Sequence, residues 1–202
     1  MLFVRHGQTP TTGNVLPGRA KGLHLGEDGH KQAEAVAKRI GAMKRQIAAV
    51  YASPLERARE TATPIAKKLG LKVTTERGLL ECDFGDWTGK RLDRLRKLPE
   101  WGTVQRYPSG FRFPNGESFT EMQARITSTI ATFRQRHPRG MVVAVSHADP
   151  IKAAVADALG THLDLFQRIV ISPCSITTII YGGGGPVVLS VNATSSDQQV
   201  VS

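Results

Sequence analysis

Short apolar runs alternate along the chain with longer segments in which apolar residues recur at helical spacing. Three runs have a length and composition typical of a buried strand, residues 2–4, 47–51 and 141–145, and the β-branched residues at 71–75 predict a further strand. The segments with apolar residues on one helical face begin near Asp28, Ser53, Ser118 and Asp149. This alternation predicts an α/β fold, a three-layer α/β/α sandwich around a mostly parallel central sheet.

Local signals mark where several of these helices start and stop. Ser53-Pro54 and Asp149-Pro150 each place a favoured N-cap residue before a proline at the first helical position. Residues 118–121 form a capping box. Gly70 has the position of a C-terminal stop, and Pro64, inside the second helical pattern, predicts a kink or the start of another helix.

Irregular composition separates these elements in two places and ends the chain. Residues 10–29 are rich in glycine without sustained periodicity, and a long loop within a compact domain is usually functional. Residues 82–115 mix aromatic residues, charges and prolines, which predicts a short helix and then irregular chain, a cap region. A short helix is expected at 162–168, a closing hairpin at 175–191, and a frayed polar tail after Asn192.

Length and charge narrow the class of protein. The 202 residues are expected to form a single domain. An excess of 27 Lys and Arg over 17 Asp and Glu favours an anionic partner. The basic residues are scattered and no nucleic-acid-binding motif is present, so a small phosphorylated molecule fits better than nucleic acid. Without a span-length apolar run or signal-peptide pattern, we expect a cytoplasmic protein with no membrane partner. Cys82 and Cys174 lack metal-ligand spacing and are expected to be reduced thiols.

The first and fourth predicted strands both end at a histidine, His6 and His147, and Arg5 precedes His6. Arg57 lies at the start of the helix that follows the second strand. Because the carboxyl ends of parallel strands meet at one edge of a sheet, these side chains are expected to converge. Buried cations need an anion, guanidinium groups match phosphate oxygens, and helix-start N–H groups, such as that of Ala148, also bind anions. This edge is therefore a candidate phosphate site, with histidine as a candidate nucleophile.

These residues lie in five motifs that resemble the histidine phosphatase superfamily, also called phosphoglycerate-mutase-like. The motifs Arg-His-Gly-x-Thr, Ser-x-Leu-x-Arg-Ala-x-x-Thr-Ala, Leu-x-Glu-x-x-x-Gly-x-Trp-x-Gly, Gly-Glu-Ser and Ser-His are matched at residues 5–9, 53–62, 79–89, 116–118 and 146–147. The resemblance extends from residue 3 to about residue 181. Five motifs in order are far more specific than a lone Arg-His-Gly.

The resemblance implies roles for individual residues. His6 is implied to be the nucleophile that forms a phosphohistidine, and Arg5, Arg57 and His147 to bind the phosphoryl group. Glu81 is implied to be the acid that protonates the leaving oxygen and then the base for the incoming water. Neither a metal nor a cofactor is implied.

Two other acids compete with Glu81 for the role of general acid. Such a group needs a raised pKa, which the apolar neighbours Leu80 and Phe84 favour for Glu81. Asp83 and Asp86 match no position of the motif. We interpret them as solvated loop acids.

The chain departs from the family pattern at two contact positions. After Thr9 the family commonly has two residues and then an asparagine that touches the phosphate, whereas here that place is Thr12. Asn14 follows two residues later and is a candidate phosphate contact. After His147 the family often has two glycines, and here Ala148 and an aspartate stand there. The N–H of Ala148 remains a candidate contact.

The resemblance implies a phosphomonoesterase that hydrolyses a small phosphorylated metabolite. A bisphosphoglycerate-dependent phosphoglycerate mutase is the alternative, but such members resemble longer chains, and the short segment 90–114 favours hydrolysis. A non-catalytic binding relative is a third hypothesis, against which His6 and Glu81 together argue. The sequence does not name the substrate, whose specificity we expect in residues 8–26 and 82–114. It also leaves the oligomeric state open, with a homodimer as one option.

Overall fold

In the computed structural model, which describes residues 1–43 and 46–194, one central sheet organises the chain. Its strands are β1 (Leu2–Arg5), β2 (Ile47–Ala52), β3 (Val73–Thr75), β4 (Met141–Ser146), β5 (Ile176–Gly182) and β6 (Gly185–Ala193). They lie in the order β3-β2-β4-β1-β5-β6. The pairs β3–β2, β2–β4 and β4–β1 are parallel, whereas β5 and β6 add an antiparallel hairpin. The predicted α/β fold with a mostly parallel sheet is confirmed.

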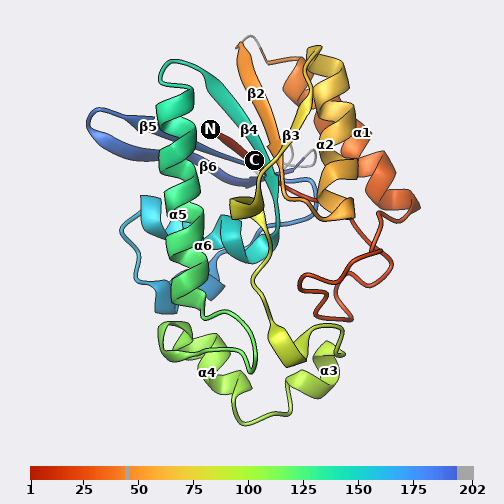
Figure 1. Ribbon diagram of the computed structural model, residues 1–202, viewed down its shortest axis with the longest axis vertical. Coiled ribbons are helices and arrows are strands. Elements are labelled where there is room, and N and C mark those ends of the chain that lie inside the picture. The colour runs from red at the N-terminus through yellow and green to blue at the C-terminus, as the bar shows by residue number, and fades with distance from the viewer. Residues whose placement is uncertain (44–45, 195–202) are drawn as a thin grey trace, which may run out of the picture.

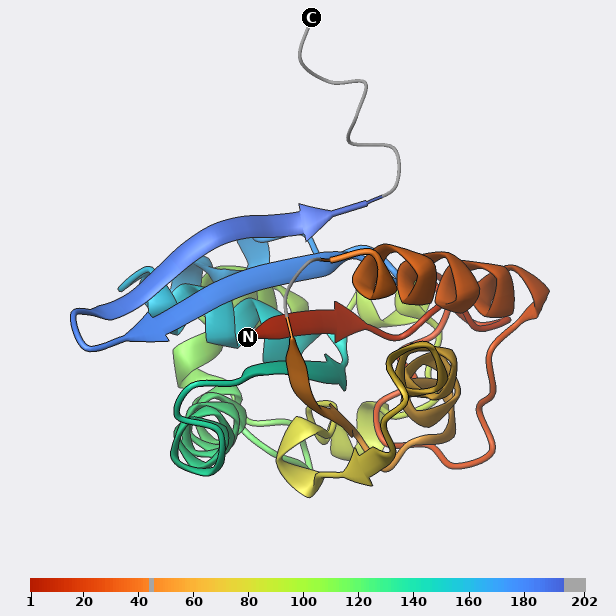
Figure 2. The ribbon, with the colours of Figure 1, turned by 90° about the horizontal axis from the view of Figure 1, so that it is seen from above.

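Helices cover both faces of this sheet (Figures 1 and 2). The α-helices are α1 (Glu27–Gly41), α2 (Glu56–Leu69), α3 (Leu92–Leu95), α4 (Trp101–Arg106), α5 (Phe119–Arg136) and α6 (Ala148–Ala158). Side chains alternate along β1, so Leu2 and Val4 pack into the apolar cluster beneath α1 and α2. Phe3 joins the cluster on the opposite face, beneath α5 and α6. The sheet is therefore the middle layer of the predicted sandwich.

Two helices start elsewhere than their capping signals predict. Helix α2 begins at Glu56 with Leu55 at its cap, and the Ser53 hydroxyl shares a hydrogen bond with His147 instead. Helix α6 begins at Ala148, so that Asp149 lies inside the first turn and pairs with Lys152. Both predicted caps are wrong: Ser53 bonds to His147 from another strand–helix junction, and Asp149 pairs with a lysine one turn further along its own helix.

The end of α2 follows its sequence signals more closely. Gly70 adopts a left-handed φ of 67°, and the N–H of Leu71 donates to the Ala66 carbonyl at 2.9 Å, as in a Schellman stop. This stop delays β3 to Val73, two residues later than predicted. Pro64 lies within α2 and does not start another helix.

The predicted cap region, residues 82–115, contains two short α-helices, α3 and α4, rather than the single helix predicted. Together with the loop of residues 8–26 it occupies the lower end of Figure 1. Main-chain hydrogen bonds join the two segments: Leu16 N–H donates to Lys90 O at 2.9 Å, and Gly89 N–H donates to Leu16 O at 2.8 Å. The cap and the loop thus form one continuous surface at the carboxyl edge of the sheet.

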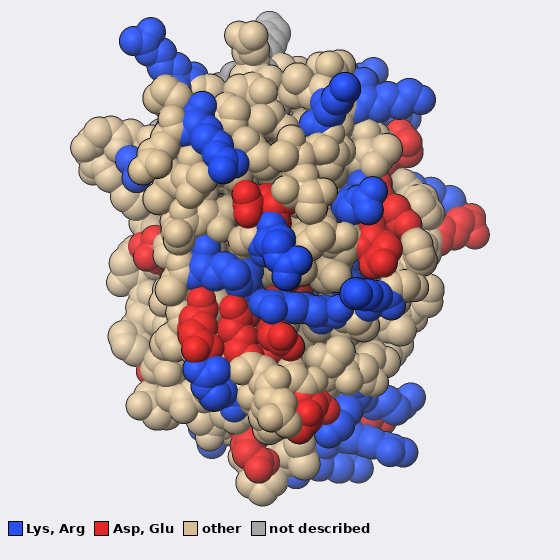
Figure 3. Space-filling view, viewed as in Figure 1, with Lys and Arg blue, Asp and Glu red and all other residues tan. Residues whose placement is uncertain are grey.

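The predicted short helix at 162–168 is present as a 3-10 helix over Leu163–Arg168, and the predicted closing hairpin is β5–β6. Of the tail expected to fray after Asn192, residues 195–202 lie outside the described residues. Among the described helices, none has the length and apolarity needed to span a bilayer. On the face drawn in Figure 3, Lys and Arg side chains are interspersed with Asp and Glu, so the basic charge forms no continuous stripe there.

The capping box of α5 gives a test of local stability. The Ser118 hydroxyl accepts from the Glu121 N–H at 3.2 Å, and the Glu121 carboxylate accepts from the Ser118 N–H at 2.9 Å. We expect Ser118→Ala to lower the free energy of unfolding by about 1 kcal/mol, because one helix-start N–H loses its partner. Urea denaturation measures the difference. Ser128→Ala, at an exposed position within the same helix, is the control, and equal losses in both variants would contradict the capping role.

Candidate active site

The sheet brings His6 and His147 together. Strands β1 and β4 are parallel neighbours with Arg5 opposite Ser146, and the His6 N–H donates to Ser146 O at 3.0 Å. The next residue of each chain segment is therefore a histidine at the same edge. The two buried imidazole rings lie with centroids 5.1 Å apart. The structure therefore confirms the prediction that the two strand ends converge.

The surroundings of His6 fix the form of its ring. Nδ1 lies 2.7 Å from the Gly7 carbonyl oxygen, which only accepts, so Nδ1 carries the hydrogen. Nε2 therefore holds a lone pair, toward which Arg57 Nε–H donates at 3.3 Å. Burial, followed by the charges of Arg57 and Arg5, lowers the pKa of His6 well below 6.5. His6 is a neutral imidazole whose unprotonated Nε2 is engaged only by this long hydrogen bond from Arg57 among the contacts of the described residues.

Among the described residues, three buried nitrogen atoms on side chains that neighbour His6 lack a hydrogen-bond partner: Arg5 Nε, Arg57 Nη1 and His147 Nδ1. The other groups of these side chains are held in place. Arg5 Nη1 donates to Ile171 O at 2.6 Å and Arg57 Nη2 to Gly18 O at 2.7 Å. Because buried polar groups are nearly always paired, and buried cations need an opposite charge, this arrangement suits a tetrahedral anion.

Glu81 supplies a carboxyl group to the same site. Its side chain is buried, and Oε1 accepts from the N–H of Cys82 at 2.9 Å. Burial raises the pKa of Glu81 to about 7, and the charge of Asp149 acts in the same direction, while Arg57 and Arg5 lower it to a smaller extent. A carboxyl group with this pKa can both give and take a proton near neutral pH. Glu81 has the properties of a general acid–base group.

The remaining candidates lie in different surroundings. Asn14 is exposed; its main-chain N–H donates to Thr11 O at 3.1 Å and its carbonyl accepts from Leu92 N–H at 2.9 Å. Among the described residues, its side chain makes no hydrogen bond to either histidine. Ala148 opens α6 directly after His147, so its N–H is among those that a helix leaves free. Asp83 pairs with Arg19 at a partly exposed position, and the exposed Asp86 accepts from Asn115 Nδ2 at 3.1 Å.

Two hydroxyl groups support the site in ways that the sequence did not reveal. Ser53 Oγ lies 2.8 Å from His147 Nε2 and orients that ring. Thr61 Oγ1 accepts from the Gly7 N–H at 3.0 Å, directly after the candidate nucleophile. A side chain at Gly7 would collide with Gly29, because a Cβ atom there would lie 2.6 Å from the Gly29 carbonyl oxygen. Both hydroxyls belong to the motif over residues 53–62, which was the available signal.

Within residues 1–43 and 46–194, His, Cys, Asp and Glu side chains do not form a group of three suited to a metal ion. The polar groups gathered around His6 are instead mostly donors, which match an anion.

The raised pKa of Glu81 predicts a pH-dependent stability. Below about pH 4.5 both folded and unfolded chains hold the proton; as the pH rises toward 7 only the unfolded chain releases it, so the folded state loses stability. Folding raises the pKa of Glu81 from 4.5 to about 7. At 1.36 kcal/mol per pKa unit, the free energy of unfolding falls by about 3 kcal/mol in total across this pH range.

Glu81→Gln removes this titration. We expect the stability of the wild type relative to this variant to fall by about 2–3 kcal/mol between pH 5 and pH 8, as measured by urea unfolding. Glu100→Gln, at an exposed position, is the control. A difference between wild type and Glu81→Gln that does not change with pH would refute the raised pKa.

Comparisons with known proteins agree with this geometry. The family model described as the histidine phosphatase superfamily (branch 1) matches residues 1–194. Phosphoserine phosphatase 1 of Hydrogenobacter thermophilus is 30% identical, over 96% of this chain and 92% of the relative. A mycobacterial glucosyl-3-phosphoglycerate phosphatase has a similar structure, with a TM-score of 0.85, 26% identity, and coverage of 96% of this chain and 98% of that one.

A third similar structure is a mutant phosphoserine phosphatase of Entamoeba histolytica in complex with phosphoserine, with a TM-score of 0.85, 26% identity, and coverage of 96% of each chain. The family match covers nearly the whole chain, and the strand ends, the buried arginines and the order of the motifs are all in keeping with it. On this evidence the chain belongs to branch 1 of the histidine phosphatase superfamily.

Proposed function

We propose that this protein hydrolyses a small phosphorylated metabolite through a phosphohistidine formed on His6. The observation that carries the proposal is a set of three buried nitrogen atoms, on Arg5, Arg57 and His147, that have no hydrogen-bond partner among the described residues. Their side chains neighbour His6, whose Nε2 holds a lone pair. A phosphoryl group bonded to Nε2 would present its oxygens to these donors. Charge that develops on those oxygens in the transition state would be stabilised there.

The first step transfers the phosphoryl group to the enzyme. Nε2 of His6 attacks phosphorus, the bond from phosphorus to the ester oxygen breaks, and the electron pair of that bond stays on the oxygen. Glu81, protonated near neutral pH because its pKa is about 7, gives its proton to this oxygen, and the alcohol leaves.

The second step regenerates the enzyme. The Glu81 carboxylate removes a proton from a water molecule, whose oxygen attacks the phosphorus of the phosphohistidine. The phosphorus–nitrogen bond breaks, its electrons return to Nε2, and inorganic phosphate leaves. Glu81 is protonated again, now with the proton taken from water, so the cycle consumes only the ester and one water molecule.

The names of the similar proteins support a small phosphomonoester as the substrate class. The relatives reported above are phosphatases named for phosphoserine and for glucosyl-3-phosphoglycerate, and one was solved with phosphoserine bound. Each of these molecules carries a phosphate on a small polar alcohol. We extend to this chain only that class, a phosphate ester of a small alcohol.

Replacement of the nucleophile tests the covalent route. We expect His6→Ala to lower kcat for 4-nitrophenyl phosphate by at least about 10³-fold, since no other group in the site takes over the attack. His30→Ala, at an exposed position of α1, serves as control. Mass spectrometry after a rapid quench without acid is expected to find phosphate on His6 during turnover. Full activity of His6→Ala would exclude the mechanism.

Hydrolase and mutase make different products from the same intermediate. Incubation with 3-phosphoglycerate is expected to release inorganic phosphate, whether or not 2,3-bisphosphoglycerate is added, because water rather than a second alcohol takes the phosphoryl group from His6. Phosphate release and 2-phosphoglycerate are measured together. Rapid formation of 2-phosphoglycerate that depends on the bisphosphate would instead establish the mutase alternative.

A further inference from the structure

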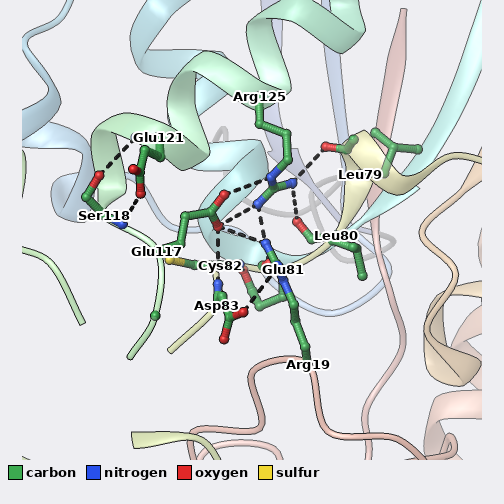
Figure 4. Close-up of polar contacts among 12 residues, drawn as sticks. Arg19, Leu79, Leu80, Glu81, Cys82, Asp83, Glu117, Ser118, Glu121 and Arg125 are labelled. Carbon is green, nitrogen blue, oxygen red and sulfur yellow. Dashed lines mark hydrogen bonds and ion pairs between the residues drawn. The ribbon is translucent and has the colours of Figure 1, made fainter. Parts of the chain in front are cut away.

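Arg19, in the loop of residues 8–26, reaches the main chain of Glu81. Its Nε donates to the Glu81 carbonyl oxygen at 2.8 Å (Figure 4). The other two nitrogens contact Asp83 Oδ2 at 3.3 Å and Glu117 Oε2 at 2.9 Å. One planar guanidinium group therefore fastens three acceptors, two from the segment that carries Glu81 and one from the residue before the α5 capping box. The side chain remains 29% exposed.

Arg125 completes the same network from α5. It forms a two-point pair with Glu117, in which Nε and Nη2 contact the two carboxylate oxygens at 2.9 Å each. Nη1 donates to Gly78 O at 2.9 Å and to Leu80 O at 2.8 Å, and Nη2 reaches Glu81 O at 3.3 Å. The main chain that leads into Glu81 is thus fixed to a long helix (Figure 4).

The position of the Glu81 carboxyl group depends on this main chain. Its Oε1 accepts from the N–H of Cys82, the adjacent residue, so the side chain is anchored on its own backbone. A displacement of the backbone therefore displaces the carboxyl group with it. In catalysis, a shift of about 1 Å in a reacting group can reduce the rate about 10²-fold.

The residue before Arg19 is tied to the phosphate-binding side of the site. The Gly18 carbonyl oxygen accepts from Arg57 Nη2 at 2.7 Å. Gly18 has a left-handed φ of 50°, and a Cβ there would lie 2.7 Å from Thr88 Oγ1, so this position favours glycine. Two consecutive residues thus connect Arg57 with the main chain of Glu81.

We propose that Arg19 is a positioning residue for Glu81, holding the general acid at a fixed place relative to Arg57; this inference rests on the function proposed above. Arg19 acts through hydrogen bonds to the main chain and to Glu117, and it does not touch the reacting atoms. Its loss is expected to slow steps in which Glu81 transfers a proton and to spare the attack of His6 on phosphorus.

Leaving groups of different basicity separate these effects. The 4-nitrophenolate ion is a weak base and leaves without protonation, whereas the alkoxide of phosphoserine or 3-phosphoglycerate is a strong base and needs a proton from Glu81. The constant kcat/KM reports on events up to formation of the phosphoenzyme, before water reacts. A defect confined to Glu81 therefore appears in kcat/KM for the alkyl esters and not for the aryl ester.

The experiment compares Arg19→Met with the wild type on 4-nitrophenyl phosphate, phosphoserine and 3-phosphoglycerate. We expect kcat/KM for the alkyl esters to fall by about 10- to 100-fold, part of the 10²–10⁴-fold that general acid catalysis supplies, while the aryl ester changes by less than about threefold. Glu81→Gln is expected to show the same selectivity with a larger loss. Arg136→Met, whose guanidinium lies 4.0 Å from Glu76 Oε2 at an exposed position near the end of α5, removes the same charge and should change neither.

Arg19→Lys separates position from charge. Lysine keeps the positive charge but not the fork that bonds three acceptors at once, so the selective loss should persist. Circular dichroism and thermal unfolding establish that each variant is folded, and Arg19→Gln repeats the comparison should the Met variant not fold.

Three results would overturn the positioning role: an equal loss on aryl and alkyl esters, no loss on either, or full recovery with lysine. If the wild type hydrolyses these esters and the Arg19 variants give one of these three results, the positioning role is wrong and the phosphatase proposal stands. A wild type that hydrolyses none of them would count against the proposed function itself, and with it against this role.

Discussion

The burial of the Arg57 guanidinium beside His6 is the constraint on which the site depends. Among the described residues, the Arg57 side chain is the largest that is fully buried, and desolvation lowers the pKa of its guanidinium group. One nitrogen is satisfied by Gly18 O and another points to His6 Nε2, while the third is unpaired. A cation held in this way is stabilised only when an anion arrives. The loop conformation at Gly18 and the placing of α2 after β2 both serve to hold that cation at the edge of the sheet.

The same surroundings move the pKa values of His6 and Glu81 in opposite directions. Burial disfavours the charged form of each group, which lowers the pKa of the imidazole and raises that of the carboxyl. At a pH above the lowered pKa of His6 and below the raised pKa of Glu81, His6 is unprotonated and Glu81 is protonated. A nucleophile with a free lone pair and an acid with a proton to give therefore coexist near neutral pH, and the proposed reaction needs both at once.

Local patterns in the sequence were sufficient for the fold and for the convergence of the strand ends. Apolar runs and helical faces depend on neighbouring residues, and parallel strands must share an edge, so His6 and His147 could be expected together. The residues at this edge by themselves indicated a phosphate site with a histidine nucleophile, whereas the individual roles, that of Glu81 above all, came from the family resemblance; both stay proposals. The two cap helices, of four and six residues, are too short to show a period, which explains why one was missed.

The sequence could not predict the contacts that polar side chains make with distant parts of the chain. Arg19 is 62 positions from Glu81 and 98 from Glu117, and no spacing rule connects a loop arginine to either. Ser53 has the signature of an N-cap, yet its hydroxyl is used by His147, because a hydroxyl bonds to whichever partner the packing brings. Such bonds follow from the fold, so they become visible only when the fold is known.

Hydrogen bonds between distant parts of the chain also couple the loop of residues 8–26 to the cap region. Residues 14–16 pair with the main chain at 89–92 of the cap, and the loop then continues to Gly18 and Arg19, which contact Arg57 and Glu81. A change in the cap that moved this loop would also move the acid relative to the phosphate-binding arginine. In the proposed enzyme, the cap and the loop are expected to select the alcohol part of the substrate. Hydrogen bonds connect them to the main chain of Glu81, the group that protonates this alcohol. An ester that fits the cap badly would be both bound less well and protonated less well, so specificity would appear in the chemical step as well as in binding.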